Sequence, residues 1–179
     1  NIEMGGQFSI HMWTSITVGF IFAFPFILWE IWKFISPALY EKEKKYAASF
    51  IIISSILFFI GVLFGYYLIA PLSVQFFASY IVSPEISNSI DIDSYMSLMK
   101  TSAIASGLLF ELPIIIFFLT KIGLVTPEFL RKYRKYTLVV VLIVAAVITP
   151  PDVLSQIIVT IPIMILYEAS ILISILVVK

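Results

Sequence analysis

The sequence contains no cysteine and only one histidine, His11, among its 179 residues. Without cysteine the chain has no disulfide, thiolate nucleophile or cysteine-ligated metal. One histidine cannot build a multi-histidine metal site, so we expect His11 to be an interfacial residue. An HExxH motif and a glycine-rich phosphate loop are also absent. A serine–lysine dyad stays open, although no pairing stands out. We therefore expect no enzymatic activity, no cofactor and no metal.

Charged residues are also scarce. They make up 12% of the chain, against 61% hydrophobic residues, and the mean hydropathy is +1.08. A soluble domain of this length does not need so much apolar surface, so the composition predicts a polytopic, all-α membrane protein. We expect membrane lipid to surround it and no nucleic acid to bind it.

Apolar stretches long enough to cross a bilayer predict a single domain, 1–179, with five spans. The predicted spans are about 12–33, 47–70, 101–121, 136–149 and 153–178. Pro71 is expected to end the second span. The fourth span has only about twelve apolar residues, which give ~18 Å of helix against a hydrocarbon core of ~30 Å. It either borrows length from the basic segment before it or thins the bilayer.

Lysine and arginine gather in two segments, 34–46 and 122–135, whereas 72–100 carries three acids and a single base. The positive-inside rule predicts that the first two are cytoplasmic loops and the third is an external loop. The N-terminus is then outside and the C-terminus cytoplasmic, in a multi-pass protein of the inner membrane. Because the chain begins outside with Asn and without a signal-peptide pattern, we expect an upstream span, hence six in the parent.

A carboxylate, Glu111, lies in the middle of the third span. Lys100 and Lys121 are each about ten residues away, roughly 15 Å of helix. An unsheltered charge at that depth costs at least ~2.5–3.5 kcal/mol, so other spans must cover it. Pro113 invites a kink beside it. Two interpretations stay open: Glu111 joins helices by hydrogen bonding, or it acts in substrate passage or conformational change.

Three local patterns predict particular contacts. Glu30 can pair with Lys33 on one helix face. Gly61 and Gly65 have the small-xxx-small spacing that permits close helix approach. The segment 126–128, Thr-Pro-Glu, is typical of a helix start.

Four short motifs then occur in order along the chain. They are FxxPALYxxEKK at 34–45, FELP at 110–113, TPPDxxSQ at 149–156 and IPxxxLYE at 161–168. Together they resemble the TatC family, the multispanning core of the twin-arginine protein translocase. The resemblance covers essentially the whole chain, from the second helix of the family onward. The family's N-terminal amphipathic segment and first helix, which supply part of the signal-peptide site, are missing here.

The resemblance implies a cupped bundle of five transmembrane helices here, six in the parent, with two short C-terminal spans. It implies a receptor and core subunit that binds the twin-arginine signal peptides of folded proteins. Such a subunit assembles with TatA- and TatB-type single-span proteins, self-associates in the translocase, and works by the proton-motive force. Glu43 would contact an arginine, because carboxylates pair bidentately with guanidinium groups. The surface around Glu43 would be shaped by Phe34, Pro37, Leu39 and Tyr40.

The resemblance also implies roles for polar residues in and near the last span. Glu111 and Gln156 would face the cup, and Glu168 is a third intramembrane polar group. The external turn that would dock single-span partners comprises Pro150, Pro151, Asp152 and Ser155. Asp152 is equally compatible with a simple cap on the last helix. The alternative function is an ion-coupled small-molecule transporter that uses Glu111, although the five spans contain no internal repeat.

Overall fold

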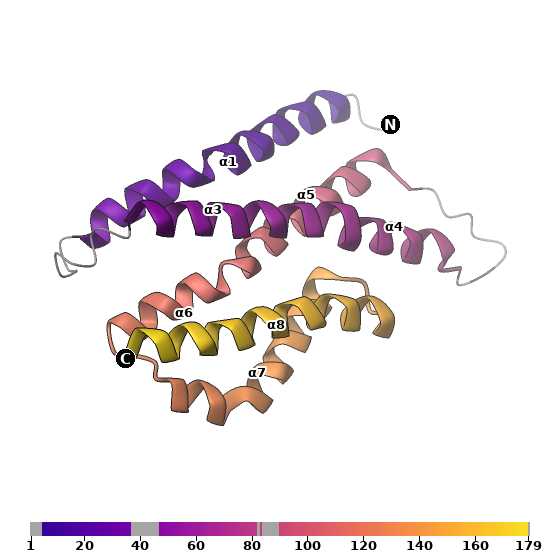
Figure 1. Cartoon of the computed structure of the whole chain (residues 1–179). Helices are drawn as coiled ribbons and strands as arrows, with labels where there is room; N and C mark the ends of the chain where they lie inside the picture. The colour runs from indigo at the N-terminus through magenta and orange to yellow at the C-terminus, as the bar shows by residue number, and fades with distance from the viewer. Residues whose placement is uncertain (1–4, 37–46, 82, 84–89, 179) are drawn as a thin grey trace.

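The computed structural model describes residues 5–36, 47–81, 83 and 90–178. Every regular element among these residues is a helix, which confirms the predicted all-α polytopic fold (Figure 1). The helices are α1 (Gly6–Ile35), α3 (Ala47–Phe64), the π-helical turn η2 (Gly65–Ile69), α4 (Ala70–Ser79), α5 (Ile92–Phe110), α6 (Leu112–Lys121), α7 (Pro127–Ile148) and α8 (Val153–Val178).

Four stretches are long and apolar enough to cross a membrane by length and composition. These are α1, the continuous helix α3–η2–α4, the pair α5–α6, and α8. The fourth predicted span lies in α7, which combines an apolar second half with a first half that carries Glu128 and four basic residues. Its 22 residues make about 33 Å of helix, of which only the part after Tyr136 is apolar.

The second span does not end at Pro71, contrary to the prediction. The helix continues through Pro71 to Ser79, and Pro71 lies in the first turn of α4. The preceding turn, η2, is wider than an α-helix, and such a turn absorbs the missing proline N–H without ending the helix. Residues 72–79 and 92–100 of the predicted external loop are therefore helical.

The segment 122–135 is likewise not a simple loop, because α7 begins at Pro127. The Thr126 hydroxyl accepts a hydrogen bond from the Phe129 N–H at 3.2 Å, so the predicted helix start is confirmed. α8 has 26 residues and is as long as an ordinary span. Of the two C-terminal helices, only α7 has a short apolar part.

Close backbone contact joins α3–η2 to α5. A Cβ added at Gly61 would lie 2.6 Å from the Ser106 carbonyl oxygen, and one at Gly65 would lie 2.3 Å from that of Ser102. No larger side chain fits at either position unless the helices separate. The predicted small-xxx-small contact is thus confirmed, and its partner is α5.

Apolar clusters fill the remaining contacts between helices. In the cluster between α1 and α3, the rings of Phe24 and Phe58 stack with their centroids 3.5 Å apart. Tyr167 of α8 donates a hydrogen bond to the Leu130 carbonyl of α7 at 2.9 Å. Thr120 of α6 and Ser174 of α8 share a hydrogen bond of 3.0 Å. The last three helices therefore form one packed unit.

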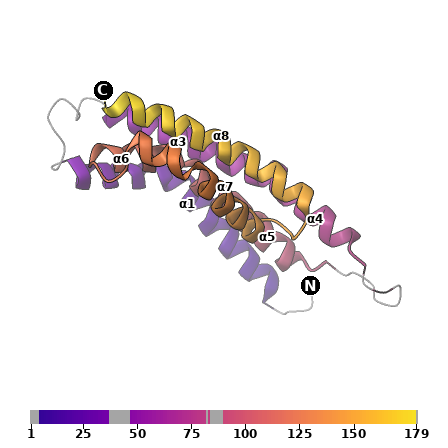
Figure 2. The same cartoon turned by 90° about the horizontal axis from the view of Figure 1, so that it is seen from below.

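The helices are arranged so that their basic ends lie together. α1, α6 and α8 end, and α7 begins, at the same side of the molecule, the left in Figure 1. Lys33, Lys121 and Lys132 belong to these ends. The view from below in Figure 2 again separates α1 from α8. These described helix ends place their lysines on one side of the molecule. The positive-inside rule predicts that this side faces the cytoplasm.

Candidate functional site

Glu111 occupies the break between α5 and α6. Its backbone lies between the two helices with φ −76° and ψ −4°, and Pro113 follows in the first turn of α6. Pro113 has no N–H to donate and cannot continue the ladder of α5, which explains the break. The kink predicted beside the carboxylate is confirmed.

The Glu111 side chain is buried, with 6% of its surface exposed. One carboxylate oxygen, Oε2, accepts a hydrogen bond from the hydroxyl of Ser54 on α3. The other oxygen, Oε1, is buried and has no hydrogen-bond partner among the described residues. The contact with Ser54 supports the helix-joining interpretation, but it satisfies only half of the carboxylate. An unsatisfied buried polar atom typically costs about 1–3 kcal/mol, so Glu111 retains capacity for a further partner.

Buried serines extend this polar character beyond Glu111. Ser102 and Ser106 lie one turn apart on α5, and Ser73 lies on α4, each at most 1% exposed. None of the three hydroxyls has a hydrogen-bond partner in the described parts of the chain. Sequence reasoning missed them. The available signal was serine recurring every fourth residue in a span, beside the glycines that pack against the same turns.

The two other predicted intramembrane groups have partners of their own. Gln156 Nε2 donates to the Leu142 carbonyl of α7 at 2.8 Å. Glu168 Oε2 accepts from Arg134 Nη2 at 2.7 Å, and both side chains are about half exposed. Both contacts tie α8 to α7. No hydrogen bond among the described residues joins Glu111, Gln156 and Glu168 to one another, so they do not form one cluster.

The turn at 149–152 is built around Asp152. Its Oδ2 accepts hydrogen bonds from the backbone N–H and from the hydroxyl of Ser155, both at 3.0 Å. These two bonds, the backbone one first, hold the pKa of the Asp152 carboxyl below its usual value. The capping interpretation of Asp152 is confirmed. Pro150 and Pro151 precede it and keep α7 and α8 apart as separate helices.

Of the predicted signal-peptide residues, only Phe34 is described. It lies in the last turn of α1 with 86% of its surface exposed. Glu43, Pro37, Leu39 and Tyr40 lie outside the described residues, so the predicted arginine contact stays a prediction. In the turn before Phe34, the Glu30–Lys33 ion pair is present at 2.7 Å, as predicted.

Aromatic rings support this end of α1. The Trp32 ring lies 5.1 Å from Phe50 of α3 and 6.1 Å from Phe118 of α6, centroid to centroid. Phe50 and Phe118 are themselves 4.7 Å apart, edge to face. Aromatic pairs at such distances add about 0.5–1.5 kcal/mol each beyond the area they bury. The helix end that carries Phe34 is therefore firmly held on two neighbours.

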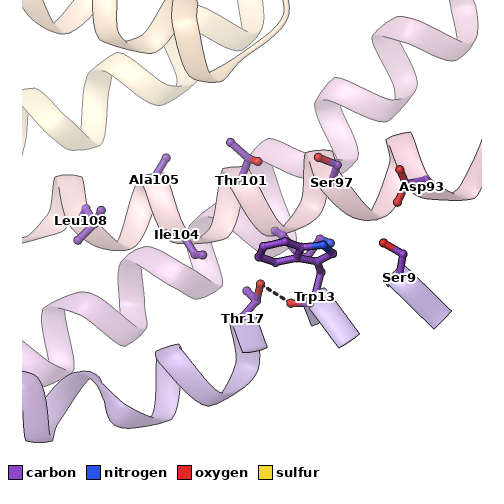
Figure 3. A pocket seen from close by; sticks show the side chains of 10 residues that line it. Ser9, Trp13, Thr17, Asp93, Ser97, Thr101, Ile104, Ala105 and Leu108 are labelled. Carbon is purple, nitrogen blue, oxygen red and sulfur yellow. Dashed lines mark hydrogen bonds between the residues drawn. The ribbon is translucent and has the colours of Figure 1, made fainter. Parts of the chain in front are cut away.

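An open groove of about 590 Å³ runs between α1 and α5 (Figure 3). Ser9 and Trp13 line it from α1, and Asp93, Ser97 and Lys100 line it from α5. None of the predicted site residues lies in it. Among the described residues no group of three or more His, Asp or Glu side chains could hold a metal ion.

Comparison with protein families gives one decisive match. The family described as "Sec-independent protein translocase protein (TatC)" matches residues 1–162. The chain belongs to the TatC family. The TatC protein of Blattabacterium sp. subsp. Periplaneta americana is 45% identical over 174 residues, which cover 97% of this chain and 65% of that relative. TatCy of Bacillus subtilis is 43% identical over 165 residues, covering 92% and 65%.

This TatC-family chain therefore spans 65% of the length of these two curated relatives. Solved structures agree with the family assignment. Two crystal structures of the twin-arginine translocase receptor TatC match it with TM-scores of 0.80 and 0.78, each at 35% sequence identity. They cover 97% and 100% of this chain, and 77% and 78% of the solved chains. The helical fold described above is thus the TatC fold.

Proposed function

We propose that this chain forms most of the receptor and core subunit of a twin-arginine translocase, which binds the twin-arginine signal peptides of folded proteins. The observation that carries the proposal is the match to a solved twin-arginine translocase receptor, over 97% of the chain with a TM-score of 0.80. The four motifs at 34–45, 110–113, 149–156 and 161–168 occur in order along the chain and support it independently.

Signal recognition takes place at the basic end of the molecule. Glu43 pairs with an arginine of the signal, while Lys44 and Lys45 repel cationic peptides that do not place a guanidinium against Glu43. Phe34, at the exposed end of α1, offers an apolar surface beside this pair. Pro37, Leu39 and Tyr40 complete that surface. The Trp32 ring packs against Phe50 and Phe118, and these contacts support a site that is formed before the signal binds.

Single-span partners of the TatA and TatB type dock at the opposite end, on the turn between α7 and α8. Val153 and Leu154 are exposed just after that turn and supply an apolar face for a membrane helix. Pro150 and Pro151 shape the turn, and the cap from Asp152 to Ser155 fixes the start of α8. Copies of the subunit associate within the translocase.

Transport uses the proton-motive force and no covalent chemistry. Glu111 and the bend beside it are the feature best suited to a change of conformation, because one carboxylate oxygen is held by Ser54 and the other is unpartnered among the described residues. The subunit resides in the inner membrane with its basic face and C-terminus in the cytoplasm.

The alternative, an ion-coupled small-molecule transporter, would use Glu111. Glu168 cannot easily add a second ion-binding carboxylate, because it is paired with Arg134 and half exposed. Membership of the TatC family also counts against it.

The proposal predicts the effect of Glu43→Gln in the full-length protein. Affinity for a twin-arginine signal peptide should fall about tenfold or more, because hydrogen bonds to charged groups contribute about 1.5–3 kcal/mol. Isothermal titration of the purified protein measures it. Glu41→Gln removes a charge two residues away and is the matched control. Unchanged affinity in Glu43→Gln, or an equal loss in the control, contradicts the assignment of Glu43.

A further inference from the structure

The first half of α7 carries more positive charge than its neighbours neutralise. Of its four basic residues, Arg134 is paired with Glu168. The other three, Arg131, Lys132 and Lys135, are exposed and form no ion pair within the described parts of the chain. Glu128, the only acid of the helix, pairs with none of them. Three unneutralised cations therefore lie within five residues on the basic side of the molecule.

Aromatic rings stand among these cations. The Tyr133 ring lies 4.5 Å from Phe129 and 5.7 Å from Tyr136, centroid to centroid. Lys132 Nζ lies 5.9 Å from the Tyr133 ring and Lys135 Nζ 5.4 Å from the Tyr136 ring. Tyrosine and lysine together are typical of the headgroup level of a bilayer, where the ring is half buried and the ammonium reaches water.

The same face of α7 continues as an apolar stripe. Tyr136, Val140, Ile143 and Val147 follow Lys132 at intervals of three or four residues and are 57%, 56%, 59% and 82% exposed. Residues at these intervals share one helix face. From Tyr136 to Val147 the stripe is about 16 Å long, close to one leaflet of a hydrocarbon core of ~30 Å. Along α7 the cations come first, then the Tyr136 ring, then the apolar stripe. A phospholipid has the same order of headgroup, glycerol and acyl chain.

We propose that this stripe is a binding site for an anionic phospholipid. Lys132 and Lys135 hold the phosphate diester, Arg131, one turn before Lys135, adds to the positive charge there, Tyr136 lies at the glycerol level, and one acyl chain follows Val140, Ile143 and Val147. The charge selects an anionic headgroup, because a zwitterionic lipid brings its own cation to the three already there. A partner membrane helix could cover only the apolar part of the stripe. If it covered the whole stripe, it would bury three unpaired cations. The inference does not rest on the proposed translocase function.

The test uses the full-length protein, stripped of lipid in detergent and titrated with fluorescent cardiolipin, with fluorescent phosphatidylcholine as the neutral probe. We expect clear preference for cardiolipin. The double variant Lys132→Gln/Lys135→Gln should weaken cardiolipin binding about fivefold for each lysine removed, so about 25-fold in all. Phosphatidylcholine binding should not change. The conservative variant Lys132→Arg/Lys135→Arg should retain the preference.

The matched control, Lys33→Gln/Lys100→Gln, removes two lysines from α1 and α5 and should leave cardiolipin affinity unchanged. Equal binding of the two lipids, or an equal loss in the control, overturns the proposal. Inorganic phosphate at millimolar concentration should not displace cardiolipin, because the acyl track contributes to binding; displacement would mean a phosphate site rather than a lipid site and overturns it too. Unchanged cardiolipin affinity in Lys132→Gln/Lys135→Gln overturns it as well.

Discussion

Asp152 and Glu111 are two carboxylates in very different surroundings. Asp152 lies in the turn before α8, where one oxygen receives both bonds from Ser155. Glu111 is buried at a helix break, and one oxygen receives its only bond among the described residues from Ser54, on another helix. The first is a local cap that sequence spacing predicts. The second depends on a residue 57 positions away, so no local pattern could name its partner.

Asp152→Ala should lower the melting temperature of the full-length protein, because it removes the cap of α8. The lowered pKa of Asp152 determines the pH range over which the cap stabilises the protein. Since the folded-state pKa lies below the ordinary aspartate value of about 3.9, the cap stabilises the protein above that value and is lost as the pH falls through the folded-state pKa. Melting curves between pH 3 and pH 7, roughly the range in which aspartate titrates, measure it.

The matched control for that experiment is Asp91→Ala. Asp91 also precedes a helix, α5, but its side chain makes no capping hydrogen bond. The control should melt like the parent protein at every pH tested. A difference between Asp152→Ala and the parent that does not shrink between pH 7 and pH 3, roughly the range tested, would contradict the capping explanation.

At the scale of helices, one prediction was wrong for a physical reason. Pro71 is a local signal for a helix end, and the turn before it outweighs that signal. The wide turn η2 carries the second helix past Pro71 to Ser79. The predicted cap at Thr126 starts α7 at Pro127, so the charged half of α7 is helical. By contrast, Gly61 and Gly65 gave a correct prediction, because close approach needs small residues whichever helix is the partner.

Gly65→Ala tests the packing of α3–η2 against α5. The added Cβ would lie 2.3 Å from the Ser102 carbonyl oxygen, so the backbones must separate. Overpacking of this kind typically costs about 1–3 kcal/mol, and we expect a lower free energy of unfolding by that amount. Gly19→Ala is the control, since nothing lies within 4 Å of a Cβ there. Equal stability of the two variants would mean that α3 and α5 are not in close contact.

At the scale of the whole molecule, the sequence predicted the all-α membrane fold and the family, while the arrangement of its polar groups needed the structure. The four motifs are specific because they occur together and in order along the chain. They do not reveal that Glu111, Gln156 and Glu168 bind three separate partners, since each partner lies on another helix. Sequence motifs identify candidate site residues, but they do not show which of these residues are in contact.

In the proposed function, the full-length protein is a receptor for twin-arginine signals. The most direct measurement is the affinity of the purified, folded protein for a signal peptide with paired arginines, beside the same peptide with paired lysines. Both peptides carry the same charge, but only guanidinium groups can pair bidentately with a carboxylate. We predict binding at least tenfold tighter for the arginine peptide, given the strength of charge-assisted hydrogen bonds. Equal affinity for both, or no binding by a folded protein, would contradict it.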